Sequence, residues 1–147
     1  MRMYFAFIAI ALLCSFTPAW ETDFAVAKVR AQQEKKYILL NFSGSDWCGP
    51  CIRMHSEIFG SDQFKQFADA NLVLVNADFP RQKKNRLPKE QEQQNDRLAD
   101  TYNAAGSFPF TVLLDASGKV LKSWDGFPKE KTDVFIDEIN QVIHGKQ

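Results

Sequence analysis

The sequence predicts an α/β domain built on a central mixed β-sheet with helices on both faces. Two apolar runs, 37–42 (YILLNF) and 72–77 (LVLVNA), have the length of buried strands, and helical patterns lie between and around them. A strand–turn–strand pattern occupies 106–124, and an amphipathic segment follows it. Strands that alternate with helices in this order are typical of a sheet with helices packed on its two sides.

Length and composition favour one folded domain. The 147 residues are enough for one domain but too few for two domains of ordinary size. Of these residues, 45% are hydrophobic, which is ample for a packed core. The 18 basic and 18 acidic residues balance, so no net charge favours nucleic acid or an anionic membrane as a partner. No internal repeat and no linker divides the chain.

Residues 1–19 have the pattern of a secretory signal peptide, which leaves 20–147 as the mature domain. A basic residue stands at position 2, 4–13 (YFAFIAIALL) are uncharged and apolar, and small residues stand one and three positions before a cut after Ala19. The expected location is therefore outside the cytoplasm, either periplasmic or secreted.

Two alternatives to cleavage stay open. The stretch 3–20 carries no charge and, at 18 residues, is about the minimum for a membrane span, so the leader can serve as an uncleaved anchor. Cys14 is a candidate for lipidation, although the residues before it fit that pattern poorly.

Caps and apolar spacing predict the helices of the first half. Thr22 is expected to cap a helix over 22–36, and 51–59 is expected to form another that Gly60 ends. Ser61 then starts a short helix. The apolar residues that these helices should bury are Phe24, Ala27 and Ala31, then Met54 and Ile58, then Phe64 and Phe67.

The second half begins with a polar stretch, 79–96. Its second part favours a helix that continues through Leu98 and Tyr102, and 115–118 (DASG) form the turn of the strand–turn–strand pattern. The last helix carries Phe135, Ile139, Val142 and Ile143 on one face. The first part of the polar stretch is basic, with Arg81, Lys83, Lys84, Arg86 and Lys89.

Two cysteines in the mature chain, Cys48 and Cys51, stand where a buried strand ends and a helix begins. A disulfide that closes a loop of two residues restrains little of the unfolded chain and would add little stability. The pair therefore indicates a redox or catalytic role rather than a structural one. Export would place it in a compartment where disulfides persist.

The position of the pair suits thiol chemistry. Cys48 at a helix N-terminus gains a partial positive charge and unpaired N–H groups, which favour its thiolate. Pro50 fits the first helical turn, Gly49 leaves the nucleophile accessible, and Trp47 forms an apolar wall beside it. Cys51, one turn on, can attack a mixed disulfide formed at Cys48.

Trp47-Cys48-Gly49-Pro50-Cys51 (WCGPC) resembles the active site of the thioredoxin family. The buried strand before it, and Phe108-Pro109 entering a strand–turn–strand some sixty residues later, resemble the same family. The resemblance covers about 22–144 and implies a thioredoxin fold. It also implies a cis-proline at Pro109 that faces the cysteines across a substrate groove lined by Phe108 and Gly126. Among relatives, the chain most resembles secreted bacterial thiol:disulfide interchange proteins.

Three positions depart from the family pattern. The buried aspartate of the family is matched by Asn41, which cannot accept a proton, and the lysine near that acid is matched by Leu74. The proline that kinks the helix after the motif is matched by Ser56. These changes put the rate of resolution and the redox potential in question.

The resemblance implies a thiol–disulfide oxidoreductase that acts on protein disulfides, with Cys48 as nucleophile, Cys51 as resolving thiol and no metal or organic cofactor. The partners expected are disulfide-containing clients and a dithiol electron donor, which a membrane-embedded protein can supply. The Gly-Pro pair favours a reductase. Two alternatives stay open: an oxidant that donates disulfides with the same residues, and a non-catalytic binding or chaperone module with the same fold.

The neighbours of the pair also have plainer interpretations. A zinc site would need two further ligands besides the cysteines, and His55 and His144 are the only histidines. His55 is expected to be a packing or surface residue rather than a proton shuttle. Asp46 is expected to be a solvated loop acid that raises the pKa of Cys48 as a like charge. The basic stretch 81–89 is either a solvated insertion or a docking surface.

Overall fold

The computed structural model describes residues 19–129 and 131–145, so the predicted leader at 1–18 lies outside the described residues. Within them, no helix is both long and apolar enough to cross a membrane. The elements follow one another along the chain in this order: β1 (Trp20–Glu21), α1 (Phe24–Glu34), β2 (Tyr37–Ser43), α2 (Gly49–Arg53), the π-helical segment η1 (Met54–Phe59), α3 (Asp62–Asn71), β3 (Leu72–Asp78), the 3₁₀ turn η2 (Lys83–Asn85), α4 (Lys89–Tyr102), β4 (Phe110–Leu114), β5 (Val120–Asp125) and α5 (Thr132–His144).

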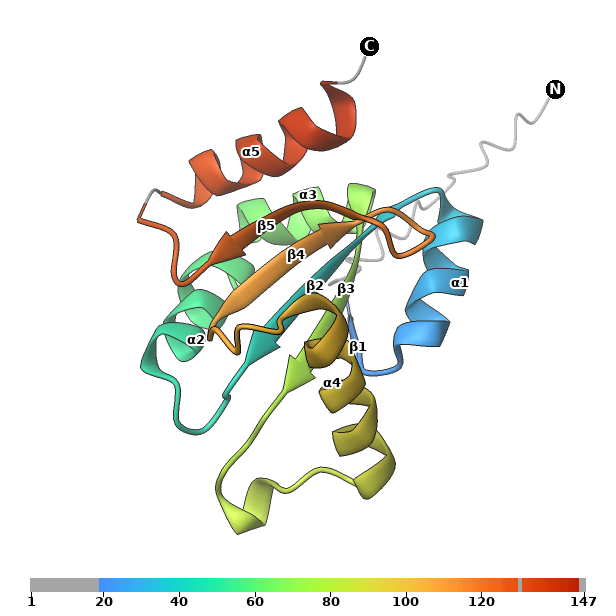
Figure 1. The fold of residues 1–147 in the computed structure, drawn as a ribbon. Coiled ribbons are helices and arrows are strands. Elements are labelled where there is room, and N and C mark those ends of the chain that lie inside the picture. Colours follow the sequence, from blue (N-terminus) through green and yellow to red (C-terminus); the bar gives the residue numbers. More distant parts are fainter. Residues whose placement is uncertain (1–18, 130, 146–147) are drawn as a thin grey trace, which may run out of the picture.

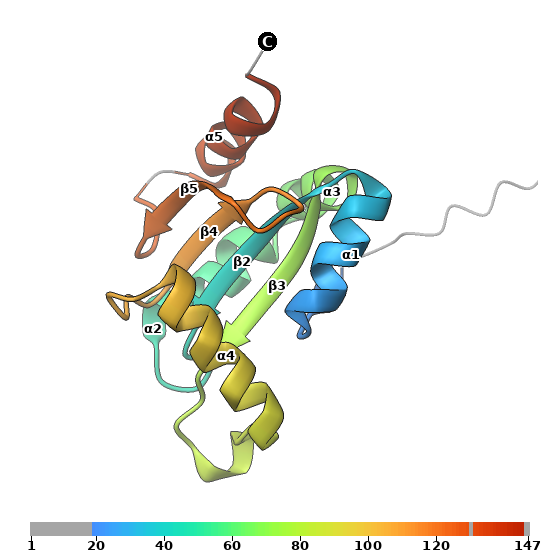
Figure 2. The same cartoon turned by 45° about the vertical axis from the view of Figure 1, so that its right-hand side comes forward.

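The five strands form one mixed sheet in the order β1-β3-β2-β4-β5. β1 and β2 both pair with β3 in parallel, whereas β4 is antiparallel to β2 and β5 is antiparallel to β4. Figures 1 and 2 show α1 and α4 on one face of this sheet and α2, α3 and α5 on the other. The predicted layered α/β fold is confirmed.

Each face of the sheet has its own hydrophobic core, because successive residues of a strand point to opposite sides. Leu39, Leu74 and Leu113 face η1, α3 and α5 and pack with Phe64 and Phe135. The alternate residues of the same strands face α1 and α4, in a second cluster that includes Ile38, Leu40, Val73, Ala27 and Leu98. The sequences of β2 and β3 are therefore almost continuously apolar, because helices cover both faces of these two strands.

The start of the domain differs from the prediction in two ways. Asp23, not Thr22, caps α1, since its carboxylate accepts the N–H groups of Ala25 and Val26 at 2.8 and 3.1 Å. Trp20 also forms an unpredicted strand with Glu21 at the edge of the sheet. Two residues are too few to show an alternating pattern, so the sequence carries no signal for this strand.

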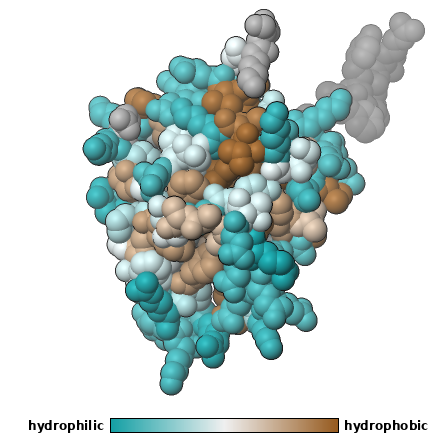
Figure 3. All heavy atoms as spheres, viewed as in Figure 1, coloured by the Kyte–Doolittle hydropathy of each residue, from teal (hydrophilic) through white to brown (hydrophobic). Residues whose placement is uncertain are grey.

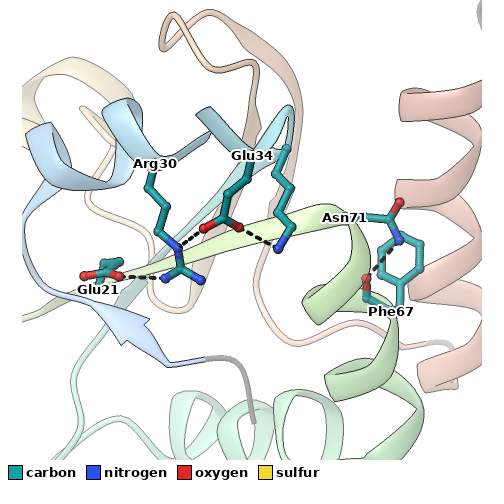
Figure 4. A network of polar contacts seen from close by, with 6 residues as sticks. Glu21, Arg30, Glu34, Phe67 and Asn71 are labelled. Atoms are coloured by element: carbon teal, nitrogen blue, oxygen red, sulfur yellow. Dashed lines mark hydrogen bonds and ion pairs between the residues drawn. The ribbon is translucent and has the colours of Figure 1, made fainter. Parts of the chain in front are cut away.

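A polar network holds this edge strand to α1. Figure 4 shows Arg30 between Glu21 of β1 and Glu34 at the end of the same helix. Its Nη1 lies 2.7 Å from Glu21 and its Nε lies 2.8 Å from Glu34, while Lys36 adds a further ion pair to Glu34 at 2.7 Å. β1 is thus attached by ion pairs as well as by its pairing with β3.

The helix predicted at 51–59 begins two residues earlier and changes type midway. The first turn is α-helical as α2, and the chain then widens into the π-helical η1. Ser56, which stands where the family has proline, donates its hydroxyl to the carbonyls of Ile52 and Arg53 at 3.1 and 3.2 Å. This region therefore departs from a regular α-helix without a proline.

Candidate functional site

Cys48 and Cys51 form a disulfide just beyond the carboxyl end of β2, with their Cα atoms 5.2 Å apart. Cys48 is the N-cap of α2, and its Sγ accepts the backbone N–H of Cys51 at 3.3 Å. Both residues are nearly buried, at 5% and 4% exposure, so burial does not distinguish a nucleophile from a resolving thiol. Their places in the helix differ, since Cys48 precedes the first turn and Cys51 lies inside it.

The two residues between the cysteines lie as predicted. Pro50 stands in the first turn of α2, where a missing N–H leaves no hydrogen bond unmade. Gly49 has no other atom within 4 Å of the position that a Cβ would take. The structure therefore leaves free the space that a side chain at position 49 would occupy.

Trp47 is anchored beside the disulfide by its indole. The ring Nε1 donates to the carbonyl of Phe79 at 2.7 Å. The ring also lies against Gly44, where a Cβ would overlap the indole atoms. Gly44 is a site residue that sequence reasoning missed, because the need for glycine there comes from Trp47 and not from an unusual backbone conformation.

The structure brings the predicted groove residues together. Phe108 packs edge-on against Trp47, with 5.5 Å between ring centroids, and the Phe108–Pro109 peptide bond is cis. The N–H of Gly126 donates to the carbonyl of Pro109 at 2.9 Å. Gly126 has φ of 80°, a conformation that favours glycine. Phe110 instead packs on Phe42 at 6.3 Å, away from these contacts.

A cavity of about 270 Å³ lies beside Cys51. Six of its eight lining residues have polar side chains; the full set is Asn41, Ser43, Ser45, Cys51, Ile52, His55, Ser56 and Asn76. Asn41 is held in place there, since it donates to Asn76 at 3.1 Å and accepts the Thr111 hydroxyl at 3.0 Å. Ser43 donates to the same Asn76 oxygen at 3.0 Å.

The register of the sheet changes the interpretation of Leu74. Leu74 pairs with Leu39 in the core, and the residue of β3 that pairs with Asn41 is Asn76. Where the family pattern has an acid, the structure thus has an amide that is hydrogen-bonded to a second amide. Asn76 was missed because its importance depends on which residue lies opposite it.

The two histidines lie apart. His55 lines the cavity with Cys51 and also packs on Trp20, with ring centroids 6.1 Å apart, whereas His144 lies 3.3 Å from Asn71. Across residues 19–129 and 131–145, no group of three or more His, Cys, Asp or Glu side chains is arranged to hold a metal ion.

Asp46 is not the freely solvated acid that the sequence suggested. The side chain is partly buried, and its carboxylate accepts the backbone N–H groups of Arg81 and Gln82 and the side-chain amide of Asn85, each at 2.9 Å. The hydrogen bond from Arg81, followed by that from Asn85, lowers the pKa of Asp46 below its ordinary value. The carboxylate therefore binds the basic stretch to the loop that carries the cysteines.

Comparisons with known proteins agree with this fold and site. A family model described as a thioredoxin-like domain matches residues 24–143. The "Disulfide bond reductase DsbH" of Chlamydia pneumoniae is 45% identical over 124 residues, which cover 84% of this chain and 72% of that protein. A solved structure named "DsbH Oxidoreductase" superposes with a TM-score of 0.78 at 34% identity, covering 96% of this chain and 94% of the other.

More distant relatives share the fold. A thioredoxin from Thermus thermophilus gives a TM-score of 0.66 at 17% identity, over 88% of this chain and 89% of its own. The "Thioredoxin-related protein DsbJ" of Chlamydia pneumoniae is 23% identical over 124 residues. These residues cover 84% of this chain and 35% of that protein.

The fold and the paired cysteines define a thiol–disulfide oxidoreductase. The chain belongs to the thioredoxin-like domain family, and within that family it is similar to DsbH. The predicted fold and the predicted class of enzyme are both confirmed.

Proposed function

We propose that this oxidoreductase is an exported reductase of protein disulfides, with Cys48 as the attacking thiol and Cys51 as the resolving thiol. The observation that carries the assignment of roles is the Cys51 N–H directed at Cys48 Sγ at 3.3 Å. A hydrogen bond to sulfur favours the charged form of the group that receives it. Cys48 is therefore the cysteine whose thiolate the backbone stabilises.

The proposed reaction proceeds in two exchanges. The Cys48 thiolate attacks one sulfur of a client disulfide, forming a mixed disulfide and releasing the other client sulfur as a thiolate. Cys51, after losing its proton, attacks Cys48 Sγ and breaks the mixed disulfide. The client leaves with two thiols, and the two electrons it gains come from the dithiol, which becomes the Cys48–Cys51 disulfide. A dithiol donor then reduces this disulfide.

The residues around the pair have matching proposed roles. In the proposed groove, an extended client segment lies beside the rings of Trp47 and Phe108 and the backbone of Pro109 and Gly126. The cavity beside Cys51 gives the resolving thiol a polar surrounding in which to lose its proton. No cofactor other than the redox disulfide takes part in these steps.

Two observations support the reducing direction, and a third supports the location. The relative at 45% identity is named a disulfide bond reductase. The Gly-Pro pair between the cysteines resembles that of reducing thioredoxins. The apolar stretch 4–13 followed by small residues supports export, with the periplasm as the proposed compartment.

The reduction potential of the Cys48–Cys51 pair tests the direction. The purified protein is equilibrated with dithiothreitol or glutathione buffers, and the fraction of free thiol is measured by alkylation. A value near that of thioredoxin, about −270 mV, supports a reductase. A value near about −120 mV, that of a strong oxidant, would show that the protein donates disulfides instead.

The Cys51→Ala variant tests the roles of the two thiols. Without a resolving thiol, mixed disulfides through Cys48 should accumulate and be visible as thiol-sensitive adducts on a non-reducing gel. The matched Cys48→Ala variant keeps Cys51 and should trap far less. Equal trapping by both variants would contradict the assignment of Cys48 as nucleophile.

A further inference from the structure

The segment from Arg81 to Lys89, here called the basic loop, is held against the loop that carries the cysteines. Asp46 accepts three N–H groups from the loop, and the side chain of Gln82 donates back to the Asp46 carbonyl at 3.2 Å. The turn η2 then folds the loop on itself, with the Asn85 N–H donating to the Gln82 carbonyl at 2.9 Å. The loop is therefore positioned relative to Cys48, two residues after Asp46.

One cation of the loop lies on the wall of the groove itself. The guanidinium carbon of Arg81 lies 3.6 Å from the centroid of the Trp47 ring, a close cation–π contact. The same ring packs on Phe108 at 5.5 Å. Arg81 thus connects the basic loop to the surface that a client disulfide would approach.

The loop carries five cations, and the two carboxylates that contact it, those of Asp46 and Glu92, offset only part of this positive charge. Its five cations are all exposed, and no acidic residue lies between positions 79 and 89. Arg86 pairs with Glu92 at 3.5 Å, but among the described residues no ion pair joins the other four to a carboxylate. Two other acids flank the loop: Asp78, which accepts the N–H of Ser45, and Glu90 in the first turn of α4.

The surface view agrees with this arrangement. In Figure 3, strongly hydrophilic side chains project at the lower end of the molecule, over the segment between β3 and α4 that Figure 1 shows there. The chain as a whole has 18 basic and 18 acidic residues, so this excess is a local feature and not a consequence of net charge.

We propose that the basic loop is a recognition surface for acidic segments that flank the disulfide of a client protein. This inference rests on the proposed function, because it assigns the specificity of the same site. Positive charge beside a reactive site raises the encounter rate of anionic partners, by about 10-fold or more at low salt. It also opposes partners with basic flanks. The loop would thus select among disulfides that Cys48 could attack equally well.

The test compares three disulfide-linked peptides of equal length whose cysteine is flanked by Asp and Glu, by Ser, or by Lys. The second-order rate constant of their reduction by the reduced protein is divided by that for dithiothreitol, which removes differences in intrinsic disulfide reactivity. The expected order is acidic, neutral, basic, with about a 10-fold advantage for the acidic peptide over the neutral one at low ionic strength. This advantage should shrink at 0.5 M salt, where charges are screened within about 4 Å.

The K83E/K84E variant reverses two charges whose side chains make none of the contacts with Asp46. It should lose the preference for the acidic peptide and keep the rate with the neutral peptide. The matched control K35E/K119E makes the same change in net charge at the opposite end of the sheet, before β2 and in the β4–β5 turn, and should behave as the parent protein. An equal loss of rate with all three peptides, or an equal effect of the control, would overturn the proposal.

A binding measurement separates this proposal from the proposed function. The same acidic peptide with serine in place of cysteine is titrated into the ¹⁵N-labelled protein, and the amide and indole signals are followed by NMR. Shifts at the basic loop and at the Trp47 indole support recognition even if no peptide is reduced, in which case only the proposed function fails. Absence of shifts at the basic loop would overturn the proposal whatever the exchange rates are.

Discussion

Two adjacent residue pairs on the same face of the sheet differ completely in character. Leu39 of β2 pairs with Leu74 of β3 inside the hydrophobic core, whereas Asn41 pairs with Asn76 in a hydrogen-bonded amide network beside Cys51. The two pairs are two residues apart, which is about 7 Å along a strand. The comparison shows that β2 and β3 contribute to the hydrophobic core at one pair of residues and to the candidate site at the pair two residues further along.

The physical difference lies in what each pair can contact. The leucines pack against apolar side chains of η1, α3 and α5, so their contribution is burial of apolar surface. The asparagines face a polar cavity and satisfy each other, with Thr111 and Ser43 completing the set. Substitutions at the leucine pair should therefore affect stability alone. Substitutions of the cysteines should affect chemistry, and substitutions at the amide pair should weaken its hydrogen-bonded network.

The largest expected effect is on chemistry alone. Cys48→Ser removes the attacking thiolate, and the rate of disulfide reduction should fall by about 10³-fold or more, since the alcohol is a far weaker nucleophile at neutral pH. Stability in the reduced state should change little. The measurements are insulin reduction and urea unfolding under reducing conditions. A residual rate within about tenfold of the parent would contradict the role of Cys48.

The next effect is on stability alone. Leu39→Ala removes a fully buried side chain from the core and should lower the free energy of unfolding by about 2–5 kcal/mol. The folded fraction should reduce disulfides at the parental rate. Val120→Ala, at a residue that is 48% exposed, is the control and should stay within about 0.5 kcal/mol. A slower exchange reaction in folded Leu39→Ala would break the division between core and site.

A smaller loss is expected at the amide pair. Asn41→Ala leaves the Thr111 hydroxyl and the Asn76 carbonyl with fewer partners, and should cost about 1–3 kcal/mol of unfolding free energy. Combining it with Thr111→Val tests the network by a double-mutant cycle in urea. The second change should cost less once Asn41 is gone. Strict additivity would show that the two side chains act independently.

The smallest effect concerns Asp46 and depends on pH. Because hydrogen bonds from the basic loop lower its pKa, the contact stabilises the docked loop above the ordinary carboxyl value of 3.8 and is lost as pH falls through the lower value in the folded state. Trp47 fluorescence should change in that acidic range. Asp46→Asn cannot titrate and should lack the change, whereas Asp69→Asn on α3 should retain it. A parent protein whose fluorescence does not change as pH falls below 3.8 would contradict the contact.

Much of the fold follows from local sequence patterns. The strands β2 and β3, the helices α3, α4 and α5 and the β4–β5 turn all lie where apolar spacing and caps predict them, within a few residues. The exceptions have physical reasons. Asp23 rather than Thr22 caps α1, since either residue can act as an N-cap and only the path of the chain selects one. The π-helical form of η1 has no distinct sequence signature.

The candidate site also has features that the sequence predicts and features that only the tertiary structure shows. The nearness of Cys48 to Cys51, the place of Pro50 in the helix and the polarity of the basic loop are properties of neighbouring residues, so the sequence by itself determines them. The tertiary structure alone decided that Asp46 binds a loop 35 residues away and that Asn76 faces Asn41. These contacts join segments distant in the chain, and they depend on the register of β2 against β3, which no local pattern specifies.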